Sequence, residues 1–192
     1  MKGKEKLIIN DERIVYADPS SASVGQGSMV MMRWEDEIMR LSSKWVTYNQ
    51  GDILEFGFGM GLSAGHIQSY KPKSHTIIEI HPEIAKKAEE WAKDKPGVKI
   101  INADWWDIKD DLEMYDGIFF DTFNDPHEPD WFKVAQSKAK PNCHISFYNN
   151  RPYRGNAYGI EVIDYIHKKV MPPKNDYYWF NKYYVPLVIH NP

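Results

Sequence analysis

The stretch ILEFGFGMGLSAG, residues 53–65, decides the predicted fold of this chain. An apolar run, Ile53-Leu54, leads into Glu55, and the following glycines stand at every second position. Glycine adopts positive φ without strain and lets a ligand approach bare backbone. We interpret the stretch as a buried strand, a tight glycine loop and a helix that begins near Leu62 with free N–H groups. A plain turn between strand and helix is the alternative.

Strand and helix patterns alternate along the rest of the chain. Strands are predicted over residues 52–58, 75–81, 98–104, 115–122 and 143–149, with a final strand or hairpin over 177–190. Helices are predicted over residues 62–70, 82–94, 129–139 and 157–170. This order is typical of a doubly wound α/β fold, with a mostly parallel sheet and helices on both faces. We expect one domain over residues 29–192.

The first 28 residues show little apolar periodicity, and DPSSASVGQGS (18–28) is rich in serine and glycine. We expect an arm over residues 1–28 that is either a frayed terminus or a lid, with Tyr16 on it. A helix is predicted to follow, with Ser28 as its N-cap. Its apolar residues recur at three- and four-residue steps: Met31, Trp34, Ile38 and Leu41.

The composition indicates a globular protein with a real core. The 192 residues are 42% hydrophobic and 27% charged, and the net charge of −3 argues against a nucleic-acid partner. Neither a signal peptide in MKGKEKLIIN nor a membrane span is evident, so we expect a cytoplasmic protein without a membrane partner. Cys143, the only cysteine, excludes an internal disulfide, and His66 and His81 have no partner at metal-ligand spacing. No metal site is therefore expected.

Acidic residues follow the next strands at the edge where a ligand would bind. Glu79 comes twenty residues after Gly59 and ends the second strand, where a carboxylate can accept both hydroxyls of a ribose. Asp104 and Trp105 follow the third strand, where they are placed to meet an adenine. The dinucleotide fingerprint G-x-G-x-x-G requires a glycine at its sixth position, and counted from Gly57 that position is Leu62.

The glycine loop and the two acids together resemble the class I methyltransferases that use S-adenosylmethionine. This resemblance implies the seven-stranded Rossmann-like sheet of those enzymes, and S-adenosylmethionine as the cofactor. It places the glycine loop against the methionine part of the cofactor, Glu79 on the ribose and Asp104 near the adenine amine. The residues implied at the cofactor are Met31, Glu55, Gly57, Gly59, Met60, Gly61, Glu79, Ile80, Asp104, Trp105 and Asp121.

Five further motifs resemble the guanidinoacetate N-methyltransferase family, which includes fungal arginine methyltransferase relatives. They are VMMRWE (30–35), LEFGFGMG (54–61), IIEI (77–80), DGIFFDT (116–122) and YYWFNKYYVPLV (177–188). The resemblance implies that Glu35 and Asp121 bind the guanidino group of a small substrate, with Asp121 accepting the proton. Chemistry agrees, because a guanidinium has a pKa above about 12 and must lose a proton as its nitrogen is methylated.

The stretch NNRPYRGN (149–156) follows the fifth strand. The family uses backbone there to hold the substrate carboxylate, which implies Tyr148, Asn149, Asn150 and Arg151 as substrate-binding residues. Arg151 and Arg154 are candidates for a cationic grip, and a solvated loop is the alternative.

Other functions remain open at this point. The acceptor could be a different amine or a protein arginine, and an aminopropyltransferase can share the same fold. A module that binds the donor without catalysis is a third alternative. A homodimer is also left open.

Overall fold

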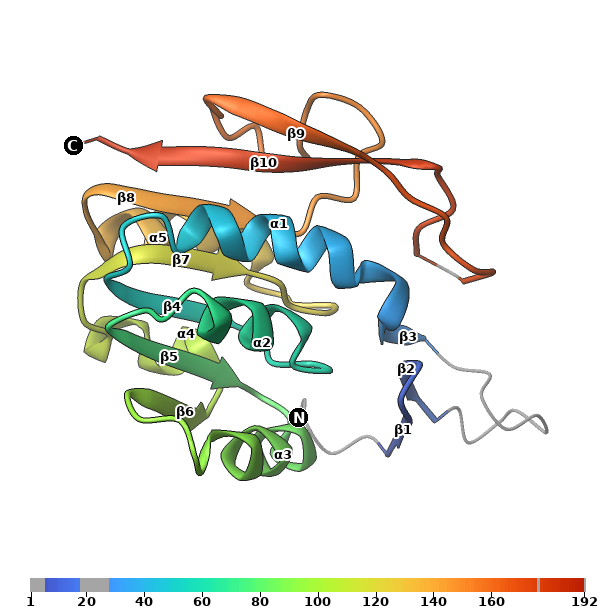
Figure 1. Cartoon of the computed structure of the whole chain (residues 1–192), viewed down its shortest axis with the longest axis horizontal. Coiled ribbons are helices and arrows are strands. Elements are labelled where there is room, and N and C mark those ends of the chain that lie inside the picture. The colour runs from blue at the N-terminus through green and yellow to red at the C-terminus, as the bar shows by residue number, and fades with distance from the viewer. Residues whose placement is uncertain (1–5, 18–27, 176, 192) are drawn as a thin grey trace.

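A central sheet of seven strands organises this computed structural model, which describes residues 6–17, 28–175 and 177–191 (Figure 1). The strand order is β6-β5-β4-β7-β8-β10-β9. Strands β4 to β8 pair in parallel, and β10 pairs antiparallel with both β8 and β9. The predicted doubly wound, mostly parallel α/β fold is confirmed. The division of the chain at residue 28 stays a prediction.

The strands and helices have the following bounds. The strands of the large sheet are β4 (Asp52–Phe56), β5 (Ser74–Glu79), β6 (Val98–Asn102), β7 (Tyr115–Phe120), β8 (Ala139–Phe147), β9 (Asp164–Lys169) and β10 (Lys182–His190). The helices are α1 (Asp36–Val46), α2 (Leu62–Ser69), α3 (Pro82–Ala92), α4 (Trp105–Ile108) and α5 (Trp131–Ser137). Short 3-10 turns are η1 (Arg33–Glu35), η2 (Lys109–Asp111) and η3 (Glu128–Asp130).

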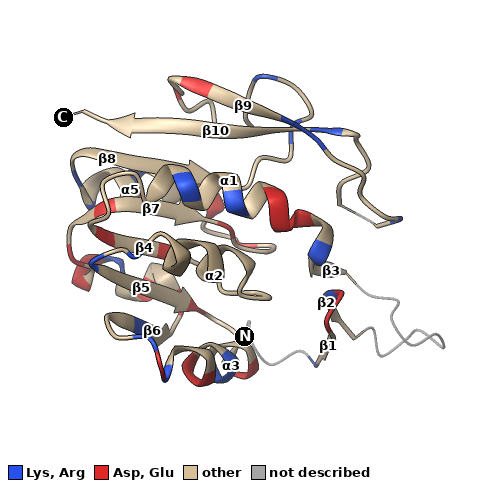
Figure 2. Cartoon of the chain, viewed as in Figure 1, with Lys and Arg blue, Asp and Glu red and all other residues tan. Residues whose placement is uncertain are grey.

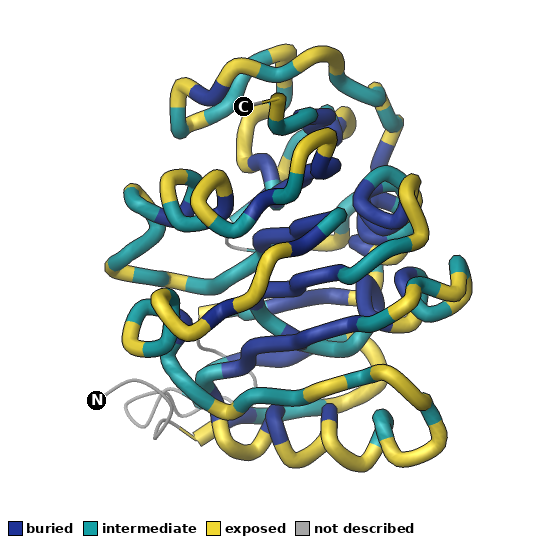
Figure 3. Tube along the Cα trace, turned by 90° about the vertical axis from the view of Figure 1, so that its left-hand side faces the viewer, coloured by how far each residue is buried: buried dark blue, intermediate teal, exposed yellow. Residues whose placement is uncertain are grey.

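Alternate residues of the central strands fill two apolar layers. Ile53 and Phe119 pack with α1 and α2 on one face of the sheet. Leu54 and Phe120 point to the other face, where they meet Trp131 of α5. Figure 3 shows the result: the inner strands are buried on both faces, whereas the outer side of α3 is exposed. Burial on both faces explains why apolar residues stand at consecutive positions in these strands.

Two predicted elements near the ends of the chain are wrong. The first is the helix predicted over residues 157–170, because β9 occupies Asp164–Lys169 and pairs with β10. The apolar residues Ile163 and Ile166 suit a helical spacing as well as an edge strand that alternates between solvent and sheet. Pairing with β10 decides in favour of the strand.

The second is the helix predicted to follow Ser28, where part of a second, small sheet lies instead. This sheet consists of β1 (Leu7–Ile9), β2 (Arg13–Tyr16) and β3 (Met29–Met32), in the order β1-β2-β3. Ser28 does not cap a helix, because the following residues extend to pair with β2 and α1 begins only at Asp36. Most of DPSSASVGQGS lies outside the described residues.

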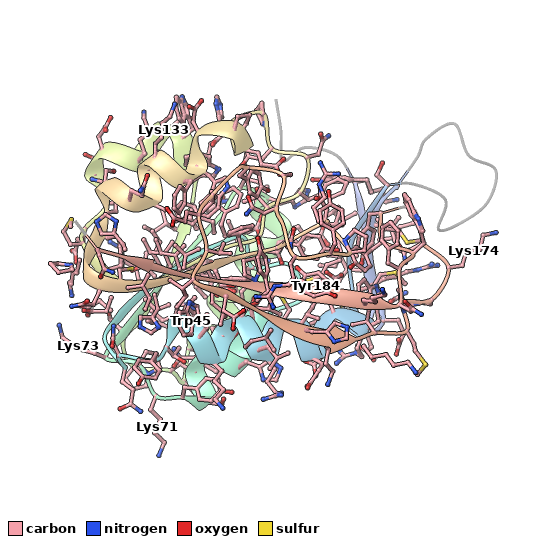
Figure 4. All side chains as sticks on the ribbon, turned by 90° about the horizontal axis from the view of Figure 1, so that it is seen from above. Trp45, Lys71, Lys73, Lys133, Lys174 and Tyr184 are labelled. Atoms are coloured by element: carbon pink, nitrogen blue, oxygen red, sulfur yellow. The ribbon has the colours of Figure 1, made fainter. Side chains whose placement is uncertain are left out.

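The small sheet and the turn before β10 both lie at the carboxyl ends of the parallel strands (Figures 1 and 4). In Figure 4, Lys174 marks that end of the molecule, and Lys71 and Lys73 mark the opposite end. Charges of both signs are spread over the helices in Figure 2, with acidic residues in the first turn of α1. No helix in the described part of the chain combines the length and apolar character needed to cross a membrane.

Candidate functional site

The glycine loop lies at the carboxyl end of β4, as predicted from its sequence. Its three alternate glycines all have positive φ: +87° at Gly57, +53° at Gly59 and +74° at Gly61. A Cβ atom at Gly57 would lie 2.2 Å from the backbone oxygen of Asp121, so glycine is required there by space as well as by conformation. The loop thus brings bare backbone against the end of β7.

A cavity of about 910 Å³, its open mouth included, lies over this loop, and we name it the glycine-loop cavity. Its walls come from the carboxyl ends of β4, β5 and β7 and from the small sheet. Eight of the residues implied at a cofactor line it: Met31, Gly57, Gly59, Glu79, Ile80, Asp104, Trp105 and Asp121. The sequence therefore predicted residues that the fold brings together from separate segments of the chain.

Glu79 is held firmly at the end of β5. One carboxylate oxygen accepts the N–H of Phe58 at 2.9 Å, and the other accepts the N–H of His81 at 2.7 Å. Each oxygen keeps a second lone pair, so the carboxylate is oriented and can still accept from a ligand in the cavity.

Asp104 and Trp105 stand at the start of α4. The Asp104 carboxylate caps this helix by accepting the N–H of Trp106 at 3.0 Å. The indole of Trp105 is buried and donates to the Asp125 carboxylate at 2.5 Å. The cavity wall next to Glu79, at the end of the neighbouring strand β6, is therefore held in place and partly aromatic.

Three of the residues implied at a cofactor do not line the cavity. Glu55 is fully buried behind the loop, where it accepts from the Ser63 hydroxyl and lies 2.9 Å from His75 Nε2. Met60 donates its N–H to the sulfur of Met31 at 3.3 Å, and Gly61 is the N-cap of α2. These residues support the loop rather than face the cavity.

A second cavity of about 720 Å³ adjoins the first, and we name it the acidic cavity. Both cavities are lined by Val30, Asp121, Thr122 and Phe123, so they meet at the end of β7. Glu35 lines only the acidic cavity. The two acids expected to bind a guanidino group therefore share one cavity, although 86 positions separate them in the sequence.

Glu35 is buried, with 2% of its surface exposed. Its Oε1 accepts the N–H of Met32 at 2.7 Å and the hydroxyl of Tyr177 at 2.5 Å. Burial raises the pKa of Glu35 to about 7, and those two hydrogen bonds oppose the rise. The site therefore contains a carboxyl group that loses its proton near neutral pH. A cationic ligand beside it would stabilise the charged form.

The pKa of Asp121 is also raised well above its ordinary value. Burial is the main cause, and the negative charges of Glu35 and Glu55 add to it. Like charges that share a desolvated site disfavour ionisation, and a cation placed between them reverses this effect. The pair is thus suited to bind a planar cation and then accept a proton from it.

We expect Glu35→Gln to stabilise the ligand-free protein at pH 8. Glutamine keeps an oxygen acceptor for Met32 and Tyr177 but removes the buried charge. Because the folded-state pKa is about 7 and the ordinary value is 4.5, wild-type stability should fall as pH rises between them and then level off. From about 1.4 kcal/mol per pKa unit, the variant should gain on the order of 2–3 kcal/mol at pH 8 relative to pH 5.

Urea unfolding at both pH values measures this difference. Glu37→Gln is the matched control, because Arg40 and Lys168 lower the pKa of this more exposed carboxyl group to about 2. At pH 8 the Glu37→Gln variant should be slightly less stable than the wild-type chain, because it loses these two ion pairs. If the wild-type chain and the Glu35→Gln variant differed in stability by the same amount at pH 5 and pH 8, ionised Glu35 would not destabilise the folded protein, and this prediction would be wrong.

The residues implied at the substrate separate into two groups. Tyr148 and Asn150 line the acidic cavity. Asn149 is buried, with its side-chain amide donating to the carbonyl oxygens of Gly155 and Tyr184, and it organises the loop instead. Arg151 is exposed and is not among the lining residues, and Arg154 pairs with Asp164 at 2.5 Å.

The lining residues of the acidic cavity that were not predicted from the sequence include Glu128, Tyr158 and Tyr177. The run YYWFNKYY stands out only as a family motif, and periodicity could not show that Tyr177 reaches Glu35. Glu128 and Tyr158 come from irregular segments that carry no pattern. Within the described ranges, no group of three or more His, Cys, Asp or Glu side chains is arranged to hold a metal ion.

Comparison with known proteins identifies relatives of the chain by sequence. The chain is 33% identical over 153 residues to protein arginine N-methyltransferase 2 of Yarrowia lipolytica, a match that covers 72% of this chain and 32% of the relative. It spans about a third of the length of the first relatives that it matches.

Two solved structures show the same fold at low identity. Spermidine synthase in complex with a transition-state analogue has a TM-score of 0.62 at 12% identity, covering 96% of this chain and 71% of that one. The O-methyltransferase TomG of Streptomyces achromogenes, in complex with SAM, has a TM-score of 0.51 at 20% identity, covering 60% and 55%.

The family model for guanidinoacetate N-methyltransferase matches residues 9–143, which include the glycine loop, Glu35 and Asp121. This match confirms the resemblance inferred from the motifs, and the chain belongs to the guanidinoacetate N-methyltransferase family.

Proposed function

We propose that this chain transfers a methyl group from S-adenosylmethionine to a guanidino nitrogen of an arginine-type acceptor. The observation that carries the proposal is the meeting of two cavities at Asp121. One cavity has the walls expected for a nucleoside and a methionine, and the other contains the two acids expected for a guanidinium.

The residues of the glycine-loop cavity fit S-adenosylmethionine. Backbone without side chains at Gly57 and Gly59 leaves room for the methionine part, and Glu79 is oriented to accept hydrogen bonds from ribose hydroxyls. Asp104 and Trp105 stand where an adenine would lie. When bound, the cofactor supplies an electrophilic sulfonium methyl, so the protein has to align the acceptor and exclude water.

The acidic cavity supplies what a guanidinium requires. A protonated guanidinium is a poor nucleophile because its lone pairs are delocalised over the planar group. Glu35 would neutralise and orient the planar cation, and Asp121, beside both cavities, would take the proton as the new N–C bond forms and the S–C bond breaks. The Tyr177 hydroxyl fixes the Glu35 carboxylate for this role.

An arginine side chain is favoured over the small guanidino compound expected from the motifs. The supporting finding is that two relatives, each 33% identical over 70% or more of the chain, are named protein arginine N-methyltransferase 2. The family name points to guanidinoacetate. Both acceptors present the same planar group, so the acids alone do not choose between them.

The decisive experiment uses the full chain, labelled S-adenosylmethionine and a panel of acceptors. The panel contains an arginine-rich protein, an acetylated arginine amide, agmatine, free arginine and guanidinoacetate, and mass spectrometry locates the methyl group. We expect methylation at a guanidino nitrogen of at least one arginine compound. Transfer to none of them, while S-adenosylhomocysteine binds, would contradict the proposal.

A further inference from the structure

A third carboxylate lines the acidic cavity beside Glu35 and Asp121. It belongs to Glu128 in the turn η3. Building on the proposed guanidino chemistry, we propose that Glu128 is a specificity-determining residue that rejects acceptors carrying a carboxylate close to the guanidinium. It would admit guanidino groups whose carrier is neutral or cationic in the cavity.

The Glu128 carboxylate is held in place rather than left to move. The hydroxyl of Tyr158 donates to Glu128 Oε1, and Tyr158 itself lines the cavity. The Tyr158 ring packs edge-on against Trp131 and Phe147, with ring centroids 5.7 and 5.3 Å apart. Trp131 and Phe147 are both buried, so packing against the core fixes the Tyr158 ring. Its hydrogen bond in turn restrains the Glu128 carboxylate.

The backbone on the other side of Glu128 is also fixed. The Asp125 carboxylate accepts the N–H of His127 at 2.9 Å and the indole N–H of Trp105 at 2.5 Å. This links the turn before η3 to the wall of the glycine-loop cavity. Glu128 is therefore held in position by its side-chain partner Tyr158 and by the anchored turn before it, as a residue that discriminates between acceptors must be.

The charges that line the acidic cavity indicate which property of an acceptor Glu128 discriminates. Among its described lining residues are three carboxylates and no lysine or arginine. A bound guanidinium brings one positive charge, which Glu35 and Asp121 can share. An acceptor with its own carboxylate would add a fourth acid, whereas a cationic carrier would find Glu128 as a partner.

The nearby arginines do not offset this balance. Arg154 pairs with Asp164 and lies over the Tyr165 ring, with its guanidinium carbon 5.8 Å from the ring centroid. Arg151 is exposed, and its backbone N–H donates to Asn149. Arg151 and Arg154, the candidates for a cationic grip, are thus not among the residues that line the cavity. A substrate carboxylate therefore has no cationic partner among the described lining residues.

The test compares kcat/KM for three acceptors: agmatine, acetylated arginine amide and guanidinoacetate. Their carriers are cationic, neutral and anionic. We expect the wild-type chain to prefer agmatine to guanidinoacetate by about tenfold or more, and Glu128→Gln to reduce that ratio by about tenfold, mainly through KM. The value for the neutral amide should change by less than about threefold.

Glu161→Gln, a change at an exposed position between β8 and β9, is the matched control and should leave the ratio unchanged. Tyr158→Phe retains the negative charge of Glu128 but removes the hydrogen bond that fixes its carboxylate. The ratio should therefore become smaller, with agmatine still preferred to guanidinoacetate. The wild-type chain gives a readout without any variant: the ratio should shrink as salt rises from about 50 to about 500 mM, because salt screens charges.

Two results separate this inference from the function on which it rests. Methylation of guanidino compounds with guanidinoacetate preferred, or with a ratio that Glu128→Gln leaves unchanged, would overturn the role of Glu128 alone. No methylation of any guanidino compound would overturn the proposed function and this inference with it.

Discussion

Replacing Asp121 by asparagine is expected to lower methyl transfer by about 10³-fold, within the range ascribed to general bases and preorganised charges. Asparagine has nearly the same shape but neither accepts a proton at neutral pH nor carries a negative charge. Asp121 lines both cavities, and its pKa is raised by burial and by Glu35 and Glu55. A carboxylate with a raised pKa is a stronger base, so its loss should affect turnover more than binding.

Single-turnover rates and the affinity for S-adenosylhomocysteine measure the two effects separately. The neutral thioether has no sulfonium charge to meet Asp121, so its affinity should change by less than about threefold. Asp107→Asn, at an exposed position of α4, is the control and should leave both quantities unchanged. A rate within tenfold of wild type would contradict the proton transfer to Asp121.

The parallel core of the fold was predictable because its patterns are local. Consecutive apolar residues stand at Ile53-Leu54, Ile77-Ile78 and Ile118-Phe119, and burial of a strand on both faces favours such neighbours. Pro82 in the first turn of α3 marked that helix in the sequence, and the structure places it there.

The two ends of the chain were not predictable in the same way. The strands β3 and β9 exist because each has a partner strand, β2 and β10, to pair with. The sequence around Met31 and Ile166 is compatible with a helix, and pairing between distant segments overrides such a weak local preference. The four residues of β2 are too few for periodicity to identify a strand.

The residues of the site likewise fall into those that local patterns could predict and those that depend on tertiary packing. The residues that follow strands, such as Glu79, Asp104 and Asp121, could be located because parallel strands bring their carboxyl ends to one edge. Glu35 could be identified as a site residue only through a family motif, because the sequence alone favours a solvated side chain for a lone acid there. Tyr177 and Glu128 enter the cavity through tertiary packing alone, which no spacing rule encodes.

Replacing Gly57 by alanine is expected to damage both the fold and the binding of the cofactor. The residue has φ of +87°, and the added Cβ would lie 2.2 Å from the backbone oxygen of Asp121. The loop has little freedom to move, because Gly57 donates its N–H to Ile78 at 2.8 Å and Asp121 donates to Phe56 at 3.0 Å. Strain and overpacking together should destabilise the protein by about 2–4 kcal/mol.

For a chain of this length, that loss lowers the melting temperature by about 2–4 °C per kcal/mol, or roughly 5–15 °C in total. Affinity for S-adenosylhomocysteine should fall by at least about tenfold, because the end of β7 is displaced into the glycine-loop cavity. Gly65→Ala is the matched control: a Cβ there meets nothing within 4 Å inside α2, so stability should be kept or rise by up to about 1 kcal/mol. If Gly57→Ala left melting temperature and affinity as they are in the Gly65→Ala variant, the loop would not be the tight backbone cradle that the proposed cofactor requires.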